Sequence, residues 1–367
     1  MFDATIVSSS QRRVMNNKHK AVTSTSHVHV MLCLRRYGLV DAYGLIEGMS
    51  CFEELRISGL RSRKTVTSAL LAAFVLLTGC ATRRIVANGF SSADPGAAAR
   101  GEYLVAAANC AGCHTDSDHH GARFAGGKAI ESPFGAYYSR NITSDPANGI
   151  GAWSDVDFLT ALRTGVSPSG AHYFAAFPFT AFSLMTDRDI LDIKAYLATM
   201  PPSATVDRAP DAPFPFDLRA AMVPWRALFF REGPFLPIEG QGVVWNRGAY
   251  LASAVIHCAE CHTPRNFLGG LKSGRGFSGA TLYGPGDVHA PNITSDRRDG
   301  IGTWSLADVE ALLDTGITPT GDFVSGPMAE VVGGTSKLTV ADRHAIAVFV
   351  KSLPPMPSDT HDRPTGG

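Results

Sequence analysis

Two stretches, NCAGCHT at Asn109–Thr115 and HCAECHT at His257–Thr263, decide the organisation of this 367-residue chain. Each carries two cysteines three positions apart, with a histidine directly after the second. The residues before them repeat as well, because GEYLVAAANCAGCHT (Gly101–Thr115) matches GAYLASAVIHCAECHT (Gly248–Thr263). Self-similarity of this kind is the signature of duplicated structural units. The sequence therefore predicts two copies of one domain.

Two further matches extend the repeat beyond the cysteine motifs. NITSDPANGIGAWS (Asn141–Ser154) matches NITSDRRDGIGTWS (Asn292–Ser305), and TGVSPSG (Thr164–Gly170) matches TGITPTG (Thr315–Gly321). Both pairs have the same offset of 151 residues. The duplication therefore covers whole domains and not the cysteine motifs alone.

The repeat sets the predicted domain boundaries. The first domain covers residues 101–202 and the second covers 248–355. Residues 203–247 are rich in proline, which is typical of a connector that runs over the surface. Residues 80–100 are predicted to be an N-terminal tether, and 356–367 a flexible tail.

Each copy has the pattern of short helices separated by loops. The spacing of apolar residues predicts a helix over Gly101–Asn109. Ser154 and Ser305 each precede an aspartate by three residues, which is capping-box spacing, and a glycine ends each of these helices. Thr186 and Thr339 open the last helix of their copies, which a proline pair ends. No strand pattern of comparable length is visible, so the predicted fold class is mostly α.

Residues 1–79 are predicted to be absent from the mature protein. The basic cluster Arg61–Lys64 precedes an apolar run and small residues, as in an export signal. Its end, Leu77–Cys80, resembles a bacterial lipoprotein cleavage box, in which the cysteine is lipidated and becomes the first residue. An ordinary secretory signal or a buried helix is the alternative. Because export signals lie at the true N-terminus, we take Met49 as the start and the preceding residues as an over-extended, unstructured beginning.

The composition is that of a globular protein without affinity for nucleic acid. Hydrophobic residues make up 45% and charged residues 18%, the net charge is zero, and no long basic run is present. An exported protein meets an oxidising environment. The four cysteines of the two copies must therefore all have a use.

Three chemistries use cysteines at this spacing. A zinc site needs four ligands, commonly two cysteine pairs about 15–20 residues apart, whereas these pairs lie in separate domains. A thioredoxin-like redox pair needs a strand–helix–strand setting, which is not visible. Cys-x-x-Cys-His is the attachment signature of c-type haem, with the histidine as proximal iron ligand. We therefore predict two covalently bound haem c groups, one held by Cys110, Cys113 and His114, the other by Cys258, Cys261 and His262.

The distal iron ligands are less clearly marked. Met328 follows Gly-Pro in a predicted loop ahead of the last helix, where a methionine can be the second axial ligand. The first copy has Phe177 in that neighbourhood, and its nearest loop methionine is Met185, which we predict as the distal ligand. His172 and an empty distal position are the alternatives.

Three residues near the predicted haems have two interpretations each. Arg140 either neutralises a haem propionate or is solvated. Trp153 and Trp304 either donate hydrogen bonds to propionates or anchor the core, and the second role is favoured.

The motifs together resemble the c-type cytochrome subunits of membrane-associated bacterial dehydrogenases. The resemblance rests on RGEYLVAAANCAGCHTD, GIGAWSDVDFLTALRTGVSPSG, RGAYLASAVIHCAECHTPRNFLGG and GPMAEVV, within nearly all of Gly101–Pro355. It implies two tandem class I cytochrome c-like domains joined by the proline-rich linker. Two features depart from the family pattern: many members have a third haem domain, and some have a methionine in place of AAFP around Phe177.

The function implied is electron transfer on the periplasmic side of a bacterial membrane, with a lipid on Cys80 as the anchor. The donor would be the catalytic subunit of a flavin, quinoprotein or molybdenum dehydrogenase, and the acceptor a quinone, a cytochrome or a terminal oxidase. The chain itself would not be an enzyme. The alternative is a dihaem enzyme, such as a thiosulfate dehydrogenase or a peroxidase, which would need an open distal position.

Overall fold

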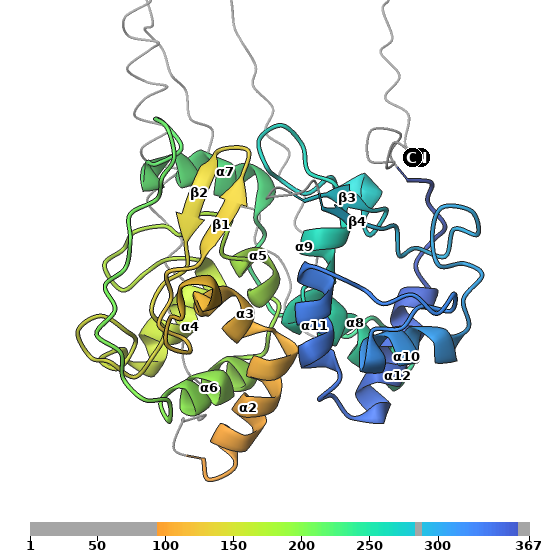
Figure 1. The fold of residues 1–367 in the computed structure, drawn as a ribbon, viewed down its shortest axis with the longest axis horizontal. Coiled ribbons are helices and arrows are strands. Elements are labelled where there is room, and N and C mark those ends of the chain that lie inside the picture. Colours follow the sequence, from red (N-terminus) through yellow and green to blue (C-terminus); the bar gives the residue numbers. More distant parts are fainter. Residues whose placement is uncertain (1–93, 283–287, 359–367) are drawn as a thin grey trace, which may run out of the picture. The chain divides into compact units, whose positions relative to one another are not determined.

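The computed structural model describes residues 94–282 and 288–358, all of which belong to one compact unit, Thr82–Gly367. The predicted signal peptide, the lipid-bearing Cys80 and most of the predicted tail lie outside the described residues. Figure 1 shows the first copy as the warm-coloured and green elements and the second as the cyan and blue ones. The described part is mostly helical, as predicted.

Each copy contributes a similar series of elements. The first contains α2 (Ala97–Ala107), α3 (Cys110–His114), η1 (Ser117–His119), β1 (Ala129–Ser132), β2 (Gly135–Tyr138), α4 (Asp155–Thr164), α5 (Phe179–Phe182) and α6 (Asp187–Leu197). The second contains α8 (Val243–Tyr250), η3 (Leu251–Val255), α9 (Cys258–His262), η4 (Ser273–Arg275), β3 (Ala280–Thr281), β4 (His289–Ala290), α10 (Leu306–Thr315), α11 (Pro327–Thr335) and α12 (Val340–Lys351).

The capping boxes predicted from the sequence are confirmed. Ser154 Oγ accepts a hydrogen bond from the backbone N–H of Asp157, and the Asp157 carboxylate accepts one from the N–H of Ser154, at 3.1 and 2.9 Å. Ser305 and Asp308 make the same pair of bonds at the start of α10. These bonds satisfy backbone donors that the first turn of a helix leaves free.

The first helix starts earlier than the sequence predicts. α2 begins at Ala97, four residues before Gly101, and ends at Ala107. Gly101 permits the close packing of α2 on α6, because a Cβ atom at this position would lie 1.8 Å from the carbonyl oxygen of Asp192. Gly248 has the same role where α8 crosses α12, at 1.8 Å from the carbonyl oxygen of Ala345.

An extra residue in the second copy is accommodated by a π-helix. Gly101 and Gly248 are 147 residues apart, whereas Cys110 and Cys258 are 148 apart. The helix of the second copy contains the π-helical segment η3 between these points. A single inserted residue in an α-helix is usually absorbed as such a bulge. The extra residue is therefore taken up before the motif helix α9, which follows its preceding helix after one left-handed residue, as α3 does.

Two small antiparallel hairpins were not predicted. β1 pairs with β2 over four residues, from Ala129 opposite Tyr138 to Ser132 opposite Gly135. β3 and β4 pair over two residues each. Strands this short show no clear alternation of polar and apolar residues, which is the signal that predicts a strand.

The connector between the copies contains helices that the sequence did not predict. It contains η2 (Arg219–Ala221) and the helix α7 (Met222–Phe229), which is drawn in green at the top of Figure 1. The ring centroid of Phe179 lies 6.3 Å from that of Trp225 and 5.1 Å from that of Phe230. The connector is therefore packed on the first copy.

The two copies exchange hydrogen bonds in a reciprocal way. Tyr103 of α2 donates to the Asp342 carboxylate at 2.6 Å and accepts from the N–H of Thr339, at the start of α12. Tyr250 of the second copy does the same at the start of α6, donating to Asp189 and accepting from the N–H of Thr186. Each copy thus caps the last helix of the other copy.

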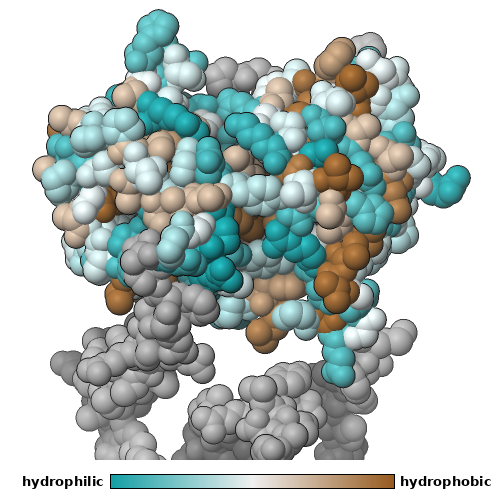
Figure 2. Space-filling view, turned by 90° about the horizontal axis from the view of Figure 1, so that it is seen from below, coloured by the Kyte–Doolittle hydropathy of each residue, from teal (hydrophilic) through white to brown (hydrophobic). Residues whose placement is uncertain are grey.

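Most of the face seen from below is hydrophilic in Figure 2, with hydrophobic residues gathered toward the side of the second copy. Val243 and Val340, at the starts of α8 and α12, are 87% and 68% exposed. Among the described residues, no helix has both the length and the apolar character needed to cross a membrane.

Candidate haem-binding sites

The two cysteine motifs have the same local conformation. Asn109 and His257 precede the first cysteines and adopt the left-handed conformation, with φ of 49° and 50°. Each motif then forms a five-residue helix. Residues three positions apart lie on one face of a helix, so both cysteines of a motif face the same side. The four motif cysteines form no disulfide with one another.

The two histidines are held by equivalent hydrogen bonds. Nδ1 of His114 lies 2.6 Å from the carbonyl oxygen of Arg140, and Nδ1 of His262 lies 2.7 Å from that of Pro291. Arg140 and Pro291 are matching positions of the repeat. A carbonyl oxygen only accepts hydrogen bonds, so Nδ1 of each ring carries the proton. Nε2 is then left with its lone pair free for a metal, which is the usual arrangement of a metal-binding histidine.

Burial keeps these groups uncharged. It lowers the pKa of both His114 and His262, and it raises the pKa of Cys110 and Cys258 to about 12. For Cys261, burial, Glu260 and then the nearby Cys113 raise the pKa to about 11. In the described part of the chain, no group of three or more His, Cys, Asp or Glu residues is placed to hold a metal ion.

Met328 lies in the first turn of α11 and not in a loop as predicted. It is half-buried and follows Gly326, whose φ of 57° turns the chain into the helix. The neighbouring Glu330 pairs with Lys128 of the first copy at 3.2 Å, and Lys128 also donates to the carbonyl oxygen of Gly112 at 2.7 Å. The predicted role of Met328 as a distal ligand remains a prediction.

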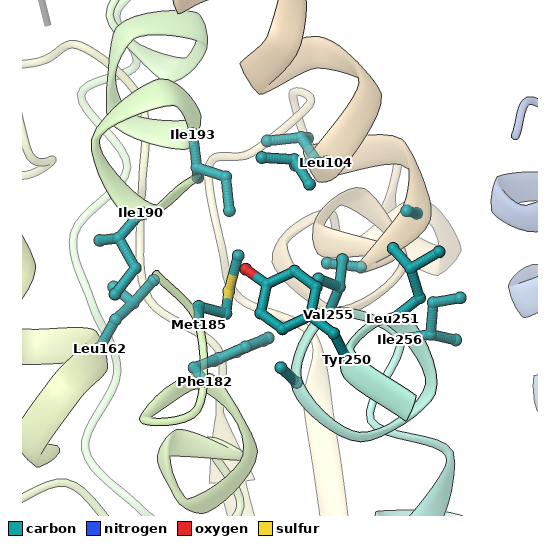
Figure 3. Packing of buried hydrophobic residues seen from close by; sticks show 14 of the residues in the cluster. Leu104, Leu162, Phe182, Met185, Ile190, Ile193, Tyr250, Leu251, Val255 and Ile256 are labelled. Atoms are coloured by element: carbon teal, nitrogen blue, oxygen red, sulfur yellow. The ribbon is translucent and has the colours of Figure 1, made fainter. Parts of the chain in front are cut away.

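Met185 lies in a closed apolar cluster. Its side chain is 0% exposed. Figure 3 shows it between Ile190 and Tyr250, close to Phe182, with Val255 of the second copy nearby. These neighbours come from α5, α6, α8 and η3. The prediction that Met185 is the first distal ligand remains untested.

The other two residues considered for the first distal side lie in the chain between α4 and α5. His172 is half-buried, and its Nδ1 has no hydrogen-bond partner. Phe177 has its ring centroid 5.4 Å from that of Tyr173 and 5.5 Å from that of Phe182. Phe182 in turn contacts the ring of His257, directly before the second motif, at 5.4 Å.

Arg140 and Arg219 make ion-pair, hydrogen-bond and ring contacts around the first copy. Arg140 pairs with Asp207 at 2.6 Å. Arg219 of the connector donates to the carbonyl oxygen of His172 at 2.8 Å and lies 5.2 Å from the ring of Phe174. Burial and then the nearby Arg140 lower the pKa of Arg219. Sequence reasoning missed Arg219, because its position in a proline-rich connector gave no sign that it returns to the first copy.

The NITSD segments and the tryptophans have structural contacts. The side chain of Asn141 donates to the carbonyl oxygens of Ser203 and Thr205, and that of Asn292 donates to Met356. Each asparagine thus fastens the chain after the last helix of its copy. Trp153 and Trp304 are partly buried against the core, which agrees with the favoured interpretation.

Comparison with known proteins identifies the class. Residues 98–201 match the family model described as Cytochrome c. The chain is 39% identical over 302 residues to the "Diheme cytochrome c-type" protein of Cereibacter sphaeroides, covering 80% of this chain and 99% of that one. It is 39% identical over 267 residues to the fructose dehydrogenase cytochrome subunit of Gluconobacter japonicus, which is 72% of this chain and 54% of that subunit.

A third relative is the cytochrome c subunit of a quinone alcohol dehydrogenase from Gluconacetobacter polyoxogenes. The identity is 36% over 293 residues, or 78% of this chain and 61% of that subunit. The chain therefore spans nearly all of the first relative and just over half of the two dehydrogenase subunits. These two dehydrogenase subunits are cytochrome subunits by name. The chain belongs to the cytochrome c family of electron-transfer proteins.

Proposed function

We propose that this protein is an exported dihaem cytochrome c that accepts electrons from a dehydrogenase and passes them to the respiratory chain, to a quinone or a terminal oxidase. A lipid on Cys80 would hold it on the periplasmic side of the membrane. The observation that carries the proposal is the equivalence of the two motifs. Each follows a residue in the left-handed conformation, and in each the histidine Nδ1 is hydrogen-bonded to a backbone carbonyl.

The residues present fit haem c at both motifs. The two neutral thiols of each motif lie on one face of a short helix, where they could form thioethers with the two vinyl groups. His114 and His262 would present Nε2 to the iron, because a backbone carbonyl fixes the proton on Nδ1. The bound haem would supply one-electron redox chemistry. The chain would set the potential through ligands, hydrogen bonds and burial.

The contacts between the copies favour electron transfer inside the molecule. Thr180 of α5 donates to Glu260 inside the second motif at 2.7 Å. Lys128 joins the carbonyl oxygen of Gly112, inside the first motif, to Glu330 of α11. The first motif is therefore linked to α11, which carries Met328, the predicted distal ligand of the second haem. The second motif is linked to α5, which lies between Phe177 and Met185 in the chain. Two haems held this way would be close enough to exchange electrons without a separate collision.

Haem stoichiometry tests the first part of the proposal. The full chain, produced in a bacterium with a cytochrome c maturation system, should carry two covalent haems in the pyridine haemochrome assay. Cys110→Ala/Cys113→Ala and Cys258→Ala/Cys261→Ala should each carry one. A wild-type chain that keeps one haem or none contradicts a dihaem function.

The partner and the anchor need separate measurements. The tagged chain should purify from membranes with a dehydrogenase, and substrates of that enzyme should reduce the haem absorption bands. Cys80→Ser should shift the protein from the membrane to the periplasmic fraction. If the tagged chain carries two haems but no added sugar, alcohol, aldehyde or acid substrate reduces them, the dehydrogenase assignment is wrong.

A further inference from the structure

We propose that the first haem has no methionine ligand, and that its distal side is formed by the aromatic cluster of Tyr173, Phe177 and Phe182, which would admit small uncharged ligands such as carbon monoxide or nitric oxide. This inference rests on the proposed attachment of haem at Cys110, Cys113 and His114. Under this inference, Met185 is not the distal ligand of that haem.

The backbone register, which is shared up to Tyr173 and Val324, favours Phe177 as the counterpart of Met328. Val166 bridges to His172 in the first copy, and Ile317 bridges to Phe323 in the second, at the repeat offset of 151. The hydrogen bonds that follow also match, because the N–H groups of Tyr173 and Val324 donate to the carbonyls of the glycines that end α4 and α10. Counting four residues beyond this shared bond gives Phe177 in the first copy and Met328 in the second. The second copy gains two residues between this bond and the next shared point, because the caps Thr186 and Thr339 are 153 residues apart.

Met185 has its own counterpart, which is not a ligand. Thr186 caps α6 and Thr339 caps α12, each accepting from the backbone N–H three residues later. The residue before the cap is Met185 in the first copy and Leu338 in the second. Both are buried, at 0% and 4% exposure. An apolar residue directly before an N-cap commonly packs on its own helix as a hydrophobic staple, and Met185 lies beside Ile190 of α6 in this way (Figure 3).

Aromatic side chains fill the surroundings of Phe177. Its ring packs edge-on against Tyr173 and tilted against Phe182. A phenyl ring has no lone pair to give to iron, whereas the thioether of Met328 does. His172 stands at the position of Phe323, which is 74% exposed in the second copy. This register places His172 at a loop position five residues from the distal one.

An iron with only the proximal histidine leaves one coordination position open to an exchangeable ligand. Walls made of aromatic rings favour uncharged ligands over anions, because transferring a charge into an apolar site is costly. The class of ligand is therefore small, neutral and able to bind ferrous iron. In the second copy, Met328 would occupy the corresponding position.

Carbon monoxide titration of the reduced, full-length protein tests this inference. The haemochrome assay first establishes two haems per chain, and its failure would contradict the proposed function and not this inference. With two haems present, the reduced wild type should bind one carbon monoxide per two haems. The oxidised wild type should show the near-infrared sulfur-to-iron band of a single methionine-ligated haem.

Three variants identify the residues. Phe177→Met should abolish carbon monoxide binding and double the near-infrared band. Met328→Phe should raise binding to two per chain and remove the band. Met185→Leu, the matched control, should change neither readout. A wild type that binds no carbon monoxide, or whose band has the intensity of two methionine-ligated haems, overturns the proposal, as does a Met185→Leu variant that gains a binding site.

Discussion

Replacing Gly334 by alanine should force α11 of the second copy away from α2 of the first. A Cβ atom on Gly334 would lie 2.2 Å from the carbonyl oxygen of Ala106, and real Cβ contacts are almost never below 3.0 Å. The two helices must therefore move apart by at least about 0.8 Å. Both atoms belong to helix backbones, so no side-chain rotation can relieve the contact. Overpacking of this kind costs about 1–3 kcal/mol.

Gly333 provides a matched control in the same helix. A Cβ atom there meets nothing within 4 Å. Both substitutions gain the same helix propensity, up to about 1 kcal/mol for glycine to alanine. The difference between the two variants therefore isolates the overpacking cost. Urea denaturation of the full chain, followed by far-ultraviolet circular dichroism, should give Gly334→Ala a free energy of unfolding about 1–3 kcal/mol below that of Gly333→Ala.

The same pair of variants tests whether α2 and α11 are packed as described. Equal denaturation midpoints for the two variants would refute the contact between Gly334 and Ala106. A higher midpoint for Gly334→Ala would do so more strongly. A fall in both midpoints relative to the wild type would instead mean that the α11 helix does not tolerate alanine at either position.

Three further predictions concern the helix starts. Tyr250→Phe removes the hydrogen bond to the Asp189 carboxylate and should lower the free energy of unfolding by about 1–2 kcal/mol, measured by urea denaturation. Burial raises the pKa of Asp342, but hydrogen bonds, first that from Arg247, outweigh burial and leave the pKa below its ordinary 3.8. The Asp342 carboxylate therefore stabilises the fold fully above its unfolded-state pKa, and this stabilisation is lost as the pH falls through the lower folded-state pKa. Asp342→Asn should thus flatten the acid loss of stability below about pH 4. Ser305→Ala should cost about 1 kcal/mol in thermal unfolding, whereas Ser305→Gly should cost only a few tenths; equal losses would refute the capping role.

The repeated features were predictable because each one is local in the sequence. The capping boxes depend on residues three positions apart, and the glycine stops depend on the next residue that can adopt a positive φ. The candidate haem motifs are local in the same sense. The sequence alone leaves the first distal position open, because Phe177 stands 151 residues before Met328 while Met185 is the nearest loop methionine.

The features that were missed depend on contacts between distant segments. The repeated tyrosines, Tyr103 and Tyr250, are visible in both copies, but nothing local says that each caps a helix of the other copy. Arg219 could be assigned to the first copy only once α7 was seen to pack there. The two hairpins were too short for alternation to appear. In each case the deciding contact joins residues far apart in the chain, and a single sequence carries no record of such pairs.

The exchanged tyrosines explain why duplication could alter one distal position without loss of the fold. Tyr103 and Tyr250 fix the two copies to each other through the starts of α6 and α12, and the proximal histidines are held by backbone carbonyls. None of these contacts uses the side chain at Phe177 or Met328. Under the proposed haem attachment, a substitution there would change what the iron meets on its distal side, while the packing between the copies and the histidine hydrogen bonds would stay the same. The two proposed sites could therefore differ in ligand and potential although their backbones are built in the same way.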